Sequence, residues 1–239
     1  MYYLKRYNTG RSAGAKVSMR SSTTMETQIA VSRGQWSYYF STDKRNSGSV
    51  LMTKSSPLIV GVCGSAREGS FNHVVLDHAL AHAESLGAQV TKIEMKGDTF
   101  PNFCEDLENR DGRPSALNDI RRLCVEADGY IMASPEYNGG PTGILKNFID
   151  WVSRSSEEVP GTPFRHKPVG LLSASTGRLG GIKGLQCLRM VLGRLGMHIS
   201  GKEFAFSGAR ENTADGKVTN EFMAGEVEAV AERLVELSQ

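Results

Sequence analysis

The chain has 239 residues, of which 39% are hydrophobic and 23% are charged, which is enough to bury the core of one domain and leave an extension. Residues 1–54 hold nine Lys or Arg against two acids, a net +7, and the whole chain is +2, so residues 55–239 carry −5. This balance excludes a basic nucleic-acid face on the folded part, and the lack of any run of 18 apolar residues excludes a predicted membrane span.

Residues 1–54 are rich in Ser and Thr, poor in acids and interrupted by Gly, without sustained apolar periodicity. We therefore expect no packed structure in this segment. Its composition is typical of an organellar transit peptide, and the alternative is an untranslated stretch with Met52 as the natural start. The folded domain is predicted to span residues 55–239. Because no signal-peptide apolar core is present, we expect a cytoplasmic location, or an organelle if the leader is a transit peptide.

From Leu58 onward the chain alternates between strand-like and helix-like patterns. Short apolar runs predict five strands, at residues 58–62, 89–95, 129–134, 168–173 and 197–206. Periodic apolar faces predict five helices, one opened by Asn72 and the others at residues 115–127, 143–154, 182–195 and 221–237. The stretches at 96–114 and 207–220 are polar or turn-like.

This alternation predicts a doubly wound, five-stranded parallel sheet of flavodoxin type with helices on both faces, because each right-handed crossover needs a covering helix. In such α/β folds ligands lie beyond the carboxyl ends of the strands, where the strand order reverses. The loops after the first, third and fourth strands should therefore share one site.

The loop after the first strand, GSAREGSFN, is typical of a phosphate-binding loop at a helix N-terminus. Two glycines permit close backbone approach, two serines offer hydroxyl donors, an arginine offers a charged fork, and an asparagine can donate or cap the helix. These residues are Gly64, Ser65, Arg67, Gly69, Ser70 and Asn72. Arg67 as a merely exposed loop cation is the less favoured alternative.

Other phosphate chemistries fit this loop less well. Neither GxxxxGK[ST] nor GxGxxG is present, which disfavours nucleoside-triphosphate hydrolysis and the usual dinucleotide fingerprint. A cysteine phosphatase would pair the thiolate of Cys63 with an arginine about six residues later, but position 69 is glycine. Cys63 is therefore predicted to be a small apolar residue at the strand end.

The other two loops suit a flat ring. Residues 135–142, PEYNGGPT, combine two prolines and two glycines that fix an irregular backbone, and Tyr137 can supply an aromatic wall or pack at the loop base. Residues 174–181, ASTGRLGG, are small and permit close backbone approach.

Together, GSAREGSFN, PEYNGG with LKNFIDWVSR, and SASTGRLGG resemble the signature loops of the NADPH-dependent FMN reductases, over about residues 57–205. That family is similar in fold to flavodoxin and includes quinone, azo-dye and chromate reductases. The resemblance implies FMN as cofactor, NADPH or NADH as donor, a small-molecule acceptor (free flavin, quinone, azo dye or chromate) and a homodimer or homotetramer. The residues that would hold the FMN phosphate are Ser65, Arg67, Ser70 and Asn72. Those that would hold the isoalloxazine are Pro135, Glu136, Tyr137, Asn138 and Gly139, with Ser175 and Gly177 completing the ring pocket.

The chain departs from the family pattern within residues 135–142, which we call the ring loop. Members often have serine where Gly140 stands and proline where Thr142 stands, and Pro141 is displaced by one position. We therefore expect the shape of this loop to differ.

Hydride transfer from nicotinamide to flavin needs no general base from the protein, so we predict no catalytic side chain. The main alternative is a flavodoxin-like electron carrier or redox sensor without its own turnover, although −5 is a mild charge for a docking surface. A flavin-free interaction protein on the same fold is the third possibility. The candidate residues for contacting the 2′-phosphate of NADPH are Arg110, Arg113 and Arg178.

Cysteine and histidine spacing predicts no metal site. The four cysteines lack CxxC spacing and are expected to be reduced, buried thiols. His78 and His82 lie four apart on one helix, but without an HExxH context a solvated face is expected. Trp151 is predicted to lie in the core or at a subunit interface.

Overall fold

The computed structural model describes residues 16–21, 27–33, 36–40, 50–54, 56–95 and 100–239, and it divides the chain into two compact units, 1–55 and 56–239. In the first unit, an antiparallel sheet has the order β1-β2-β3-β4. Its strands are β1 (Lys16–Ser21), β2 (Thr27–Arg33), β3 (Trp36–Phe40) and β4 (Val50–Lys54).

These four strands differ from the expectation of a segment without packed structure. They contain β-branched and aromatic residues, such as Ile29, Val31 and Tyr38, whose strand preference the compositional argument did not weigh. The transit-like nature of residues 1–54, and the alternative start at Met52, stay predictions.

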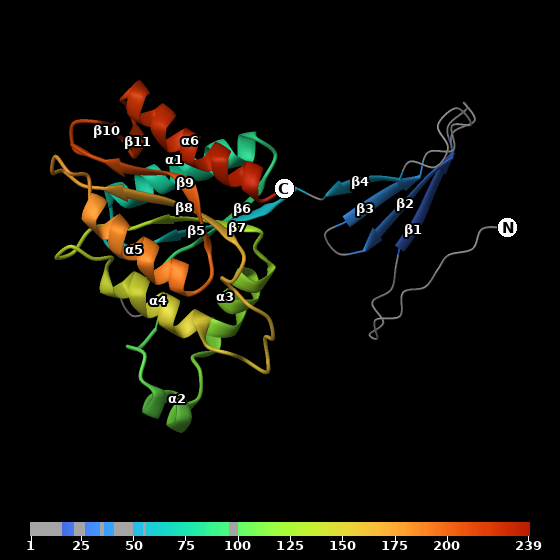
Figure 1. The fold of residues 1–239 in the computed structure, drawn as a ribbon, viewed down its shortest axis with the longest axis horizontal. Helices are drawn as coiled ribbons and strands as arrows, with labels where there is room; N and C mark the ends of the chain where they lie inside the picture. The colour runs from blue at the N-terminus through green and yellow to red at the C-terminus, as the bar shows by residue number, and fades with distance from the viewer. Residues whose placement is uncertain (1–15, 22–26, 34–35, 41–49, 55, 96–99) are drawn as a thin grey trace. The chain divides into compact units, whose positions relative to one another are not determined.

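The second unit contains a parallel sheet in the order β6-β5-β7-β8-β9, which confirms the flavodoxin type (Figure 1). Its strands are β5 (Leu58–Cys63), β6 (Gln89–Ile93), β7 (Gly129–Ala133), β8 (Pro168–Ala174) and β9 (His198–Phe206). The five predicted helices are present as α1 (Phe71–Ser85), α3 (Ser115–Glu126), α4 (Gly143–Ser153), α5 (Ile182–Arg194) and α6 (Glu221–Leu237).

In the second unit, one helix and one hairpin lie where the sequence predicted no element. Helix α2 (Glu105–Asp111) falls in the polar stretch 96–114, of which residues 96–99 lie outside the described residues. This helix buries no residue, so it has no apolar face that periodicity could reveal. A short hairpin of β10 (Thr213–Ala214) and β11 (Lys217–Val218) falls in the stretch 207–220.

Helices α1 and α6 cover one face of the sheet at very close range. A Cβ added at Gly61 of β5 would lie 2.5 Å from Cδ1 of Leu80, and one at Gly170 of β8 would lie 2.8 Å from Cγ1 of Val230. The buried alanines of this layer are Ala79, Ala83, Ala88, Ala133, Ala174, Ala209 and Ala231. Small side chains therefore let both helices lie against the strand backbones.

The same two helices are joined at their surface by two histidine–glutamate pairs. Nε2 of His78 lies 2.9 Å from Oε1 of Glu228, and Nε2 of His82 lies 3.1 Å from Oε1 of Glu232. Both rings are partly exposed at this surface, and their partners on α6 are contacts that the prediction of a solvated histidine face did not include.

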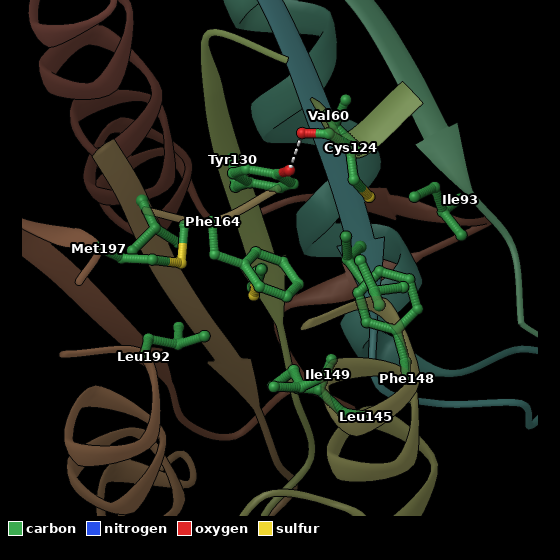
Figure 2. Close-up of a cluster of buried hydrophobic side chains, with 14 of the residues drawn as sticks. Val60, Ile93, Cys124, Tyr130, Leu145, Phe148, Ile149, Phe164, Leu192 and Met197 are labelled. Carbon is green, nitrogen blue, oxygen red and sulfur yellow. Dashed lines mark hydrogen bonds between the residues drawn. The ribbon is translucent and has the colours of Figure 1, made fainter. Parts of the chain in front are cut away.

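Helices α3, α4 and α5 cover the other face, over a core of large side chains (Figure 2). Its buried aromatic residues are Phe100, Tyr130, Phe148, Trp151 and Phe164. The hydroxyl oxygen of Tyr130 lies 2.6 Å from the carbonyl oxygen of Cys124 and 2.7 Å from that of Pro163, so its one hydrogen has an acceptor inside the core. The core position of Trp151 confirms one of the two readings of that residue.

All four cysteines are free thiols, as predicted, but their burial differs. Cys63 and Cys124 are buried, Cys187 is intermediate and Cys104 is exposed, so the expectation of burial is wrong for Cys104. Burial raises the pKa of Cys63 to about 11 and that of Cys124 to about 12. Cys63 thus lies at the strand end as an inert apolar residue, which argues against a thiolate nucleophile.

Within the described part of the chain, no group of three or more His, Cys, Asp or Glu residues is arranged to hold a metal ion. Among the same residues, no helix is long and apolar enough to cross a membrane.

Candidate functional site

The loop after β5 leads directly into the N-terminus of α1. Ser70 caps this helix, with its hydroxyl accepting from the backbone N–H of Asn72 at 3.3 Å, and the first turn contains no acidic residue. Gly69 has φ +62°, a left-handed conformation that glycine adopts without strain. An acid-free helix N-terminus presents N–H groups and positive potential to an anion.

Arg67 is the cation of this loop. Its side chain is exposed, its Nη1 donates to the carbonyl of Glu68 at 3.3 Å, and its guanidinium lies 5.9 Å from the ring centroid of Phe71. Among the described residues no carboxylate pairs with it. The buried Ser65 hydroxyl accepts from the Arg67 backbone N–H at 3.3 Å, which holds the backbone of the loop at this residue.

Asn72 has a partner that the sequence did not indicate. Its Nδ2 donates to the carbonyl of Ala174 at 2.9 Å, and its Oδ1 accepts from the N–H of Ala174 at 2.9 Å. The side chain is buried and joins the loop after β5 to the end of β8. Ser70, rather than Asn72, caps the helix.

The ring loop after β7 contains a tight turn. Tyr137 and Gly140 exchange two backbone hydrogen bonds of 2.9 and 3.0 Å, and the residues between them, Asn138 and Gly139, have φ of +52° and +82°. Positive φ at both central residues is characteristic of a type I′ turn. Tyr137 is 58% exposed at this turn, so the reading in which it packs at the loop base is wrong.

Thr142 joins the ring loop to the phosphate loop. Its buried hydroxyl donates to the carbonyl of Gly64 at 2.5 Å and accepts from the N–H of Leu145 at 3.3 Å as the cap of α4. This is the position where family members often have proline. At the other departure, a Cβ on Gly140 would meet nothing nearer than 3.8 Å, so the turn has room for a serine there.

Glu136 joins the ring loop to the segment after β8. Its Oε2 accepts from the backbone N–H groups of Lys183 at 3.1 Å and Gly184 at 3.2 Å. Its carboxylate is therefore used at the start of α5. Pro135, just before it, is half-buried and accepts at its carbonyl from the Ser134 hydroxyl at 2.9 Å.

The loop after β8 folds back on itself. The Ser175 hydroxyl accepts from the N–H of Gly177 at 3.1 Å, and the backbone of Ser175 bonds to Phe206 and Ala209. Gly177 is exposed. The three loops that the sequence placed at one site are thus joined pairwise by Asn72, Thr142 and Glu136.

A cavity of about 410 Å³ opens between the loop after β5 (residues 64–70, the phosphate loop), the ring loop and the start of α4. Of the predicted site residues, the cavity brings together Ser65, Arg67 and Tyr137. The predicted residues outside its lining are Ser70, Asn72, Pro135, Glu136, Asn138, Gly139, Ser175 and Gly177. Its other lining residues are Gly64, Ala66, Met95, Phe100, Asn102, Thr142, Gly143, Ile144 and Asn147. Sequence reasoning missed Met95, at the end of a predicted strand, and Phe100 and Asn102, in the following stretch without periodicity.

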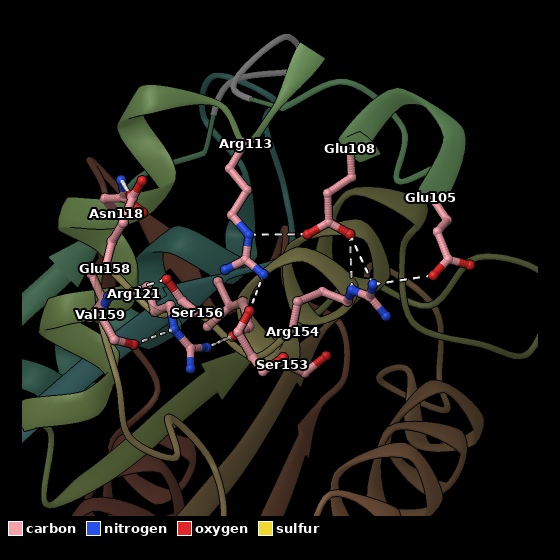
Figure 3. A network of polar contacts seen from close by, with 12 residues as sticks. Glu105, Glu108, Arg113, Asn118, Arg121, Ser153, Arg154, Ser156, Glu158 and Val159 are labelled. Carbon is pink, nitrogen blue, oxygen red and sulfur yellow. Dashed lines mark hydrogen bonds and ion pairs between the residues drawn. The ribbon is translucent and has the colours of Figure 1, made fainter. Parts of the chain in front are cut away.

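Two of the arginines that the sequence suggested for a nicotinamide 2′-phosphate already have carboxylate partners, and Figure 3 shows the polar network around one of them, Arg113. Nε of Arg113 donates to Oε1 of Glu108 at 3.0 Å, and Arg154 contacts Oε2 of the same carboxylate at 3.0 Å. Arg110 pairs with its neighbour Asp111 at 2.6 Å. Arg178 lies exposed in the loop after β8, which leaves it as the candidate of the three without a carboxylate partner among the described residues.

Comparison with known proteins shows the family to which a chain with these loops belongs. A family model described as NADPH-dependent FMN reductase matches residues 57–211. The chain is 34% identical over 157 residues to an NAD(P)H-dependent FMN reductase of Pseudomonas aeruginosa, covering 66% of this chain and 80% of that protein. It is 31% identical over 157 residues to a quinone reductase of Escherichia coli, with coverages of 66% and 80%.

Among solved structures, the flavoenzyme FerB, an NAD(P)H:(acceptor) oxidoreductase of Paracoccus denitrificans, superposes with a TM-score of 0.64 at 23% identity. The match covers 76% of this chain and 97% of that chain, and it confirms the fold.

Proposed function

Because the chain belongs to the NADPH-dependent FMN reductase family, we propose that the loops after β5, β7 and β8 form its FMN site. The protein is an oxidoreductase that uses FMN as cofactor and NAD(P)H as electron donor. When bound, FMN supplies the redox chemistry, accepting a hydride from the nicotinamide and passing the electrons to a small acceptor.

The observation that carries the placement of FMN is the anion site at the start of α1. The first turn of the helix has no acid, and Arg67 lies exposed beside it with no carboxylate partner among the described residues. Ser65 and Ser70 add hydroxyl groups to the same loop, and Asn72 keeps a second Nδ2 hydrogen beyond the one it gives to Ala174. These groups fit a phosphate monoester, which is strongly anionic at neutral pH and accepts several charge-assisted hydrogen bonds.

The ring is held, in this proposal, by the turn of the ring loop. Pro135, Asn138 and Gly139 present backbone groups, and the exposed Tyr137 provides an aromatic face. Glu136 contributes through its backbone, since its carboxylate bonds to α5. Ser175 and Gly177 approach the ring from the opposite loop. The protein's task is to orient the rings and exclude water, so no side chain acts as a general base.

The acceptor proposed is a small molecule, of which quinones have the strongest support because relatives are named as quinone reductases. Free flavin, azo dyes and chromate are the further candidates. We propose a homodimer or homotetramer located in the cytoplasm, or in an organelle if residues 1–54 act as a transit peptide. Nucleic acid and membrane partners are not part of the proposal.

An anaerobic absorbance titration of the purified protein with FMN, then NADPH, then NADH, tests this function. Bleaching of the yellow band of bound FMN is the expected result, and the faster nucleotide identifies the preferred donor. Bound flavin that neither nucleotide reduces would support the electron-carrier alternative instead. Absence of flavin binding would contradict the assignment of all three loops.

A further inference from the structure

Helix α5 begins without a cap of its own. Its N-cap residue is Gly181, which has φ +95° and no side chain to accept from the first N–H groups, and the first turn contains no acidic residue. The first N–H groups of a helix have no partner within the helix and carry partial positive charge. A capping group must therefore come from elsewhere in the fold.

Glu136 supplies that group from the ring loop, 47 and 48 residues earlier in the chain. Its Oε2 lies 3.1 Å from the nitrogen of Lys183 and 3.2 Å from that of Gly184. A carboxylate at this position forms charge-assisted hydrogen bonds and complements the helix dipole. The contact thus links the ring loop to the helix that follows the third loop of the site.

The backbone is shaped to receive Glu136. A Cβ added at Gly184 would lie 3.1 Å from Cβ of Glu136, 3.2 Å from its Cα and 3.2 Å from the carbonyl oxygen of Gly140. The ring loop therefore lies flat against the first turn of α5, and Gly184 is the residue that permits this approach. A side chain there would push the ring loop and α5 apart.

Apart from this packing, few hydrogen bonds join these two segments. The β7–β8 ladder ends at the hydrogen bond from Ser134 N to Leu172 O, 3.0 Å long. Beyond it, among the described residues, the hydrogen bonds between 135–142 and 174–184 are those made by Glu136. Asn72 and Thr142 join the other two pairs of loops, so Glu136 completes a closed set of three links.

We propose that Glu136 is a positioning residue whose carboxylate sets the separation between the ring loop and the first turn of α5, and so the placement of the ring loop in the proposed FMN site. This rests on the proposed function. It assigns Glu136 a role through α5 in place of the direct ring contact that the sequence resemblance implied. Glutamine keeps an acceptor oxygen at this position and loses only the charge, so it should replace glutamate in large part.

Amide hydrogen exchange at Lys183 and Gly184, measured without flavin, and FMN affinity, measured by fluorescence titration, test this role in the full-length protein. In Glu136→Ala, exchange at both amides should speed up about tenfold or more, FMN affinity should fall about 5- to 20-fold, and the visible spectrum of bound FMN should shift. In Glu136→Gln, the amide exchange rates and the FMN affinity should return to within about threefold of wild type, and bound FMN should show the wild-type spectrum. Gly184→Ala, which keeps the carboxylate but forces the segments apart, should also weaken FMN binding.

Glu221→Ala is the matched control, because Glu221 is an exposed acid in the first turn of α6. It should leave exchange at Lys183 and FMN affinity unchanged. Unchanged exchange or unchanged affinity in Glu136→Ala would overturn the proposal. Failure of Glu136→Gln to rescue would also overturn it, because an acceptor oxygen bonded to Lys183 and Gly184 would then not be enough to position the ring loop. A wild-type protein that binds no FMN would overturn the proposed function itself, which keeps the two failures distinct.

Discussion

Replacing Thr142 with valine should lower the free energy of unfolding by about 2 to 4 kcal/mol. Thr142 is 1% exposed, and its hydroxyl donates to Gly64 O at 2.5 Å and accepts from Leu145 N at 3.3 Å. Valine fills nearly the same volume but makes neither bond. A buried carbonyl left unpaired costs about 1 to 3 kcal/mol, and the loss of a helix cap costs about 1 kcal/mol.

Urea unfolding followed by circular dichroism measures this change, and a loss of 3 kcal/mol corresponds to a melting temperature lower by about 6 to 12 °C for a unit of this size. Thr142→Ser keeps the hydroxyl and loses one buried methyl group, so it should cost only about 1 kcal/mol. A valine variant within about 0.5 kcal/mol of wild type would refute the reasoning, because the two hydrogen bonds would then contribute almost nothing.

Three further predictions address charge and titration. Arg67→Ala should weaken FMN binding by about 1.5 to 3 kcal/mol, or about 10- to 150-fold, and the control Arg210→Ala, at an exposed arginine, should leave it unchanged. Equal FMN affinities of Arg67→Ala and wild type in a titration would remove Arg67 from the site. A thiol reagent at pH 8 should modify the exposed Cys104 quickly but reach Cys63 only on unfolding, because burial raises the pKa of Cys63 to about 11; rapid labelling of Cys63 in the native protein would contradict this. Burial lowers the pKa of Lys167 to about 8, against about 10.4 in an unfolded chain, so the unfolded state binds more protons between these two pH values. The free energy of unfolding of the wild type should therefore rise relative to that of Lys167→Met from pH 7.5 to 9.5. A constant difference in unfolding free energy over this range would argue against the pKa shift.

The fold was predictable because each major element buries a face that leaves a period in the sequence. Helix α1 shows this, since Val75, Leu76, Ala79, Leu80 and Ala83 are all buried as their spacing predicts. Helix α2 shows the limit, because it buries nothing and is held by charged contacts such as that between Glu108 and Arg113.

The site was predictable as loops but not as contacts. Strand ends and glycine placement located the three loops, because topology alone brings the carboxyl ends of parallel strands together. The bond from Asn72 to Ala174 spans 102 residues and that from Thr142 to Gly64 spans 78, and no local pattern encodes such pairs. The same holds for Met95 and Phe100, whose place in the cavity follows from packing rather than propensity.

The two faces of the sheet will respond to changes of side-chain volume in opposite ways. Under α1 and α6, an extra methyl group at Gly61 or Gly170 must displace Leu80 or Val230 from a layer that is already filled. Under α3, α4 and α5, the damaging change is truncation of a large residue such as Trp151, which leaves a void that its neighbours only partly close. In a complete mutational scan, rejection of enlargement at glycine positions should therefore mark the face under α1 and α6, and rejection of truncation at aromatic positions should mark the other face.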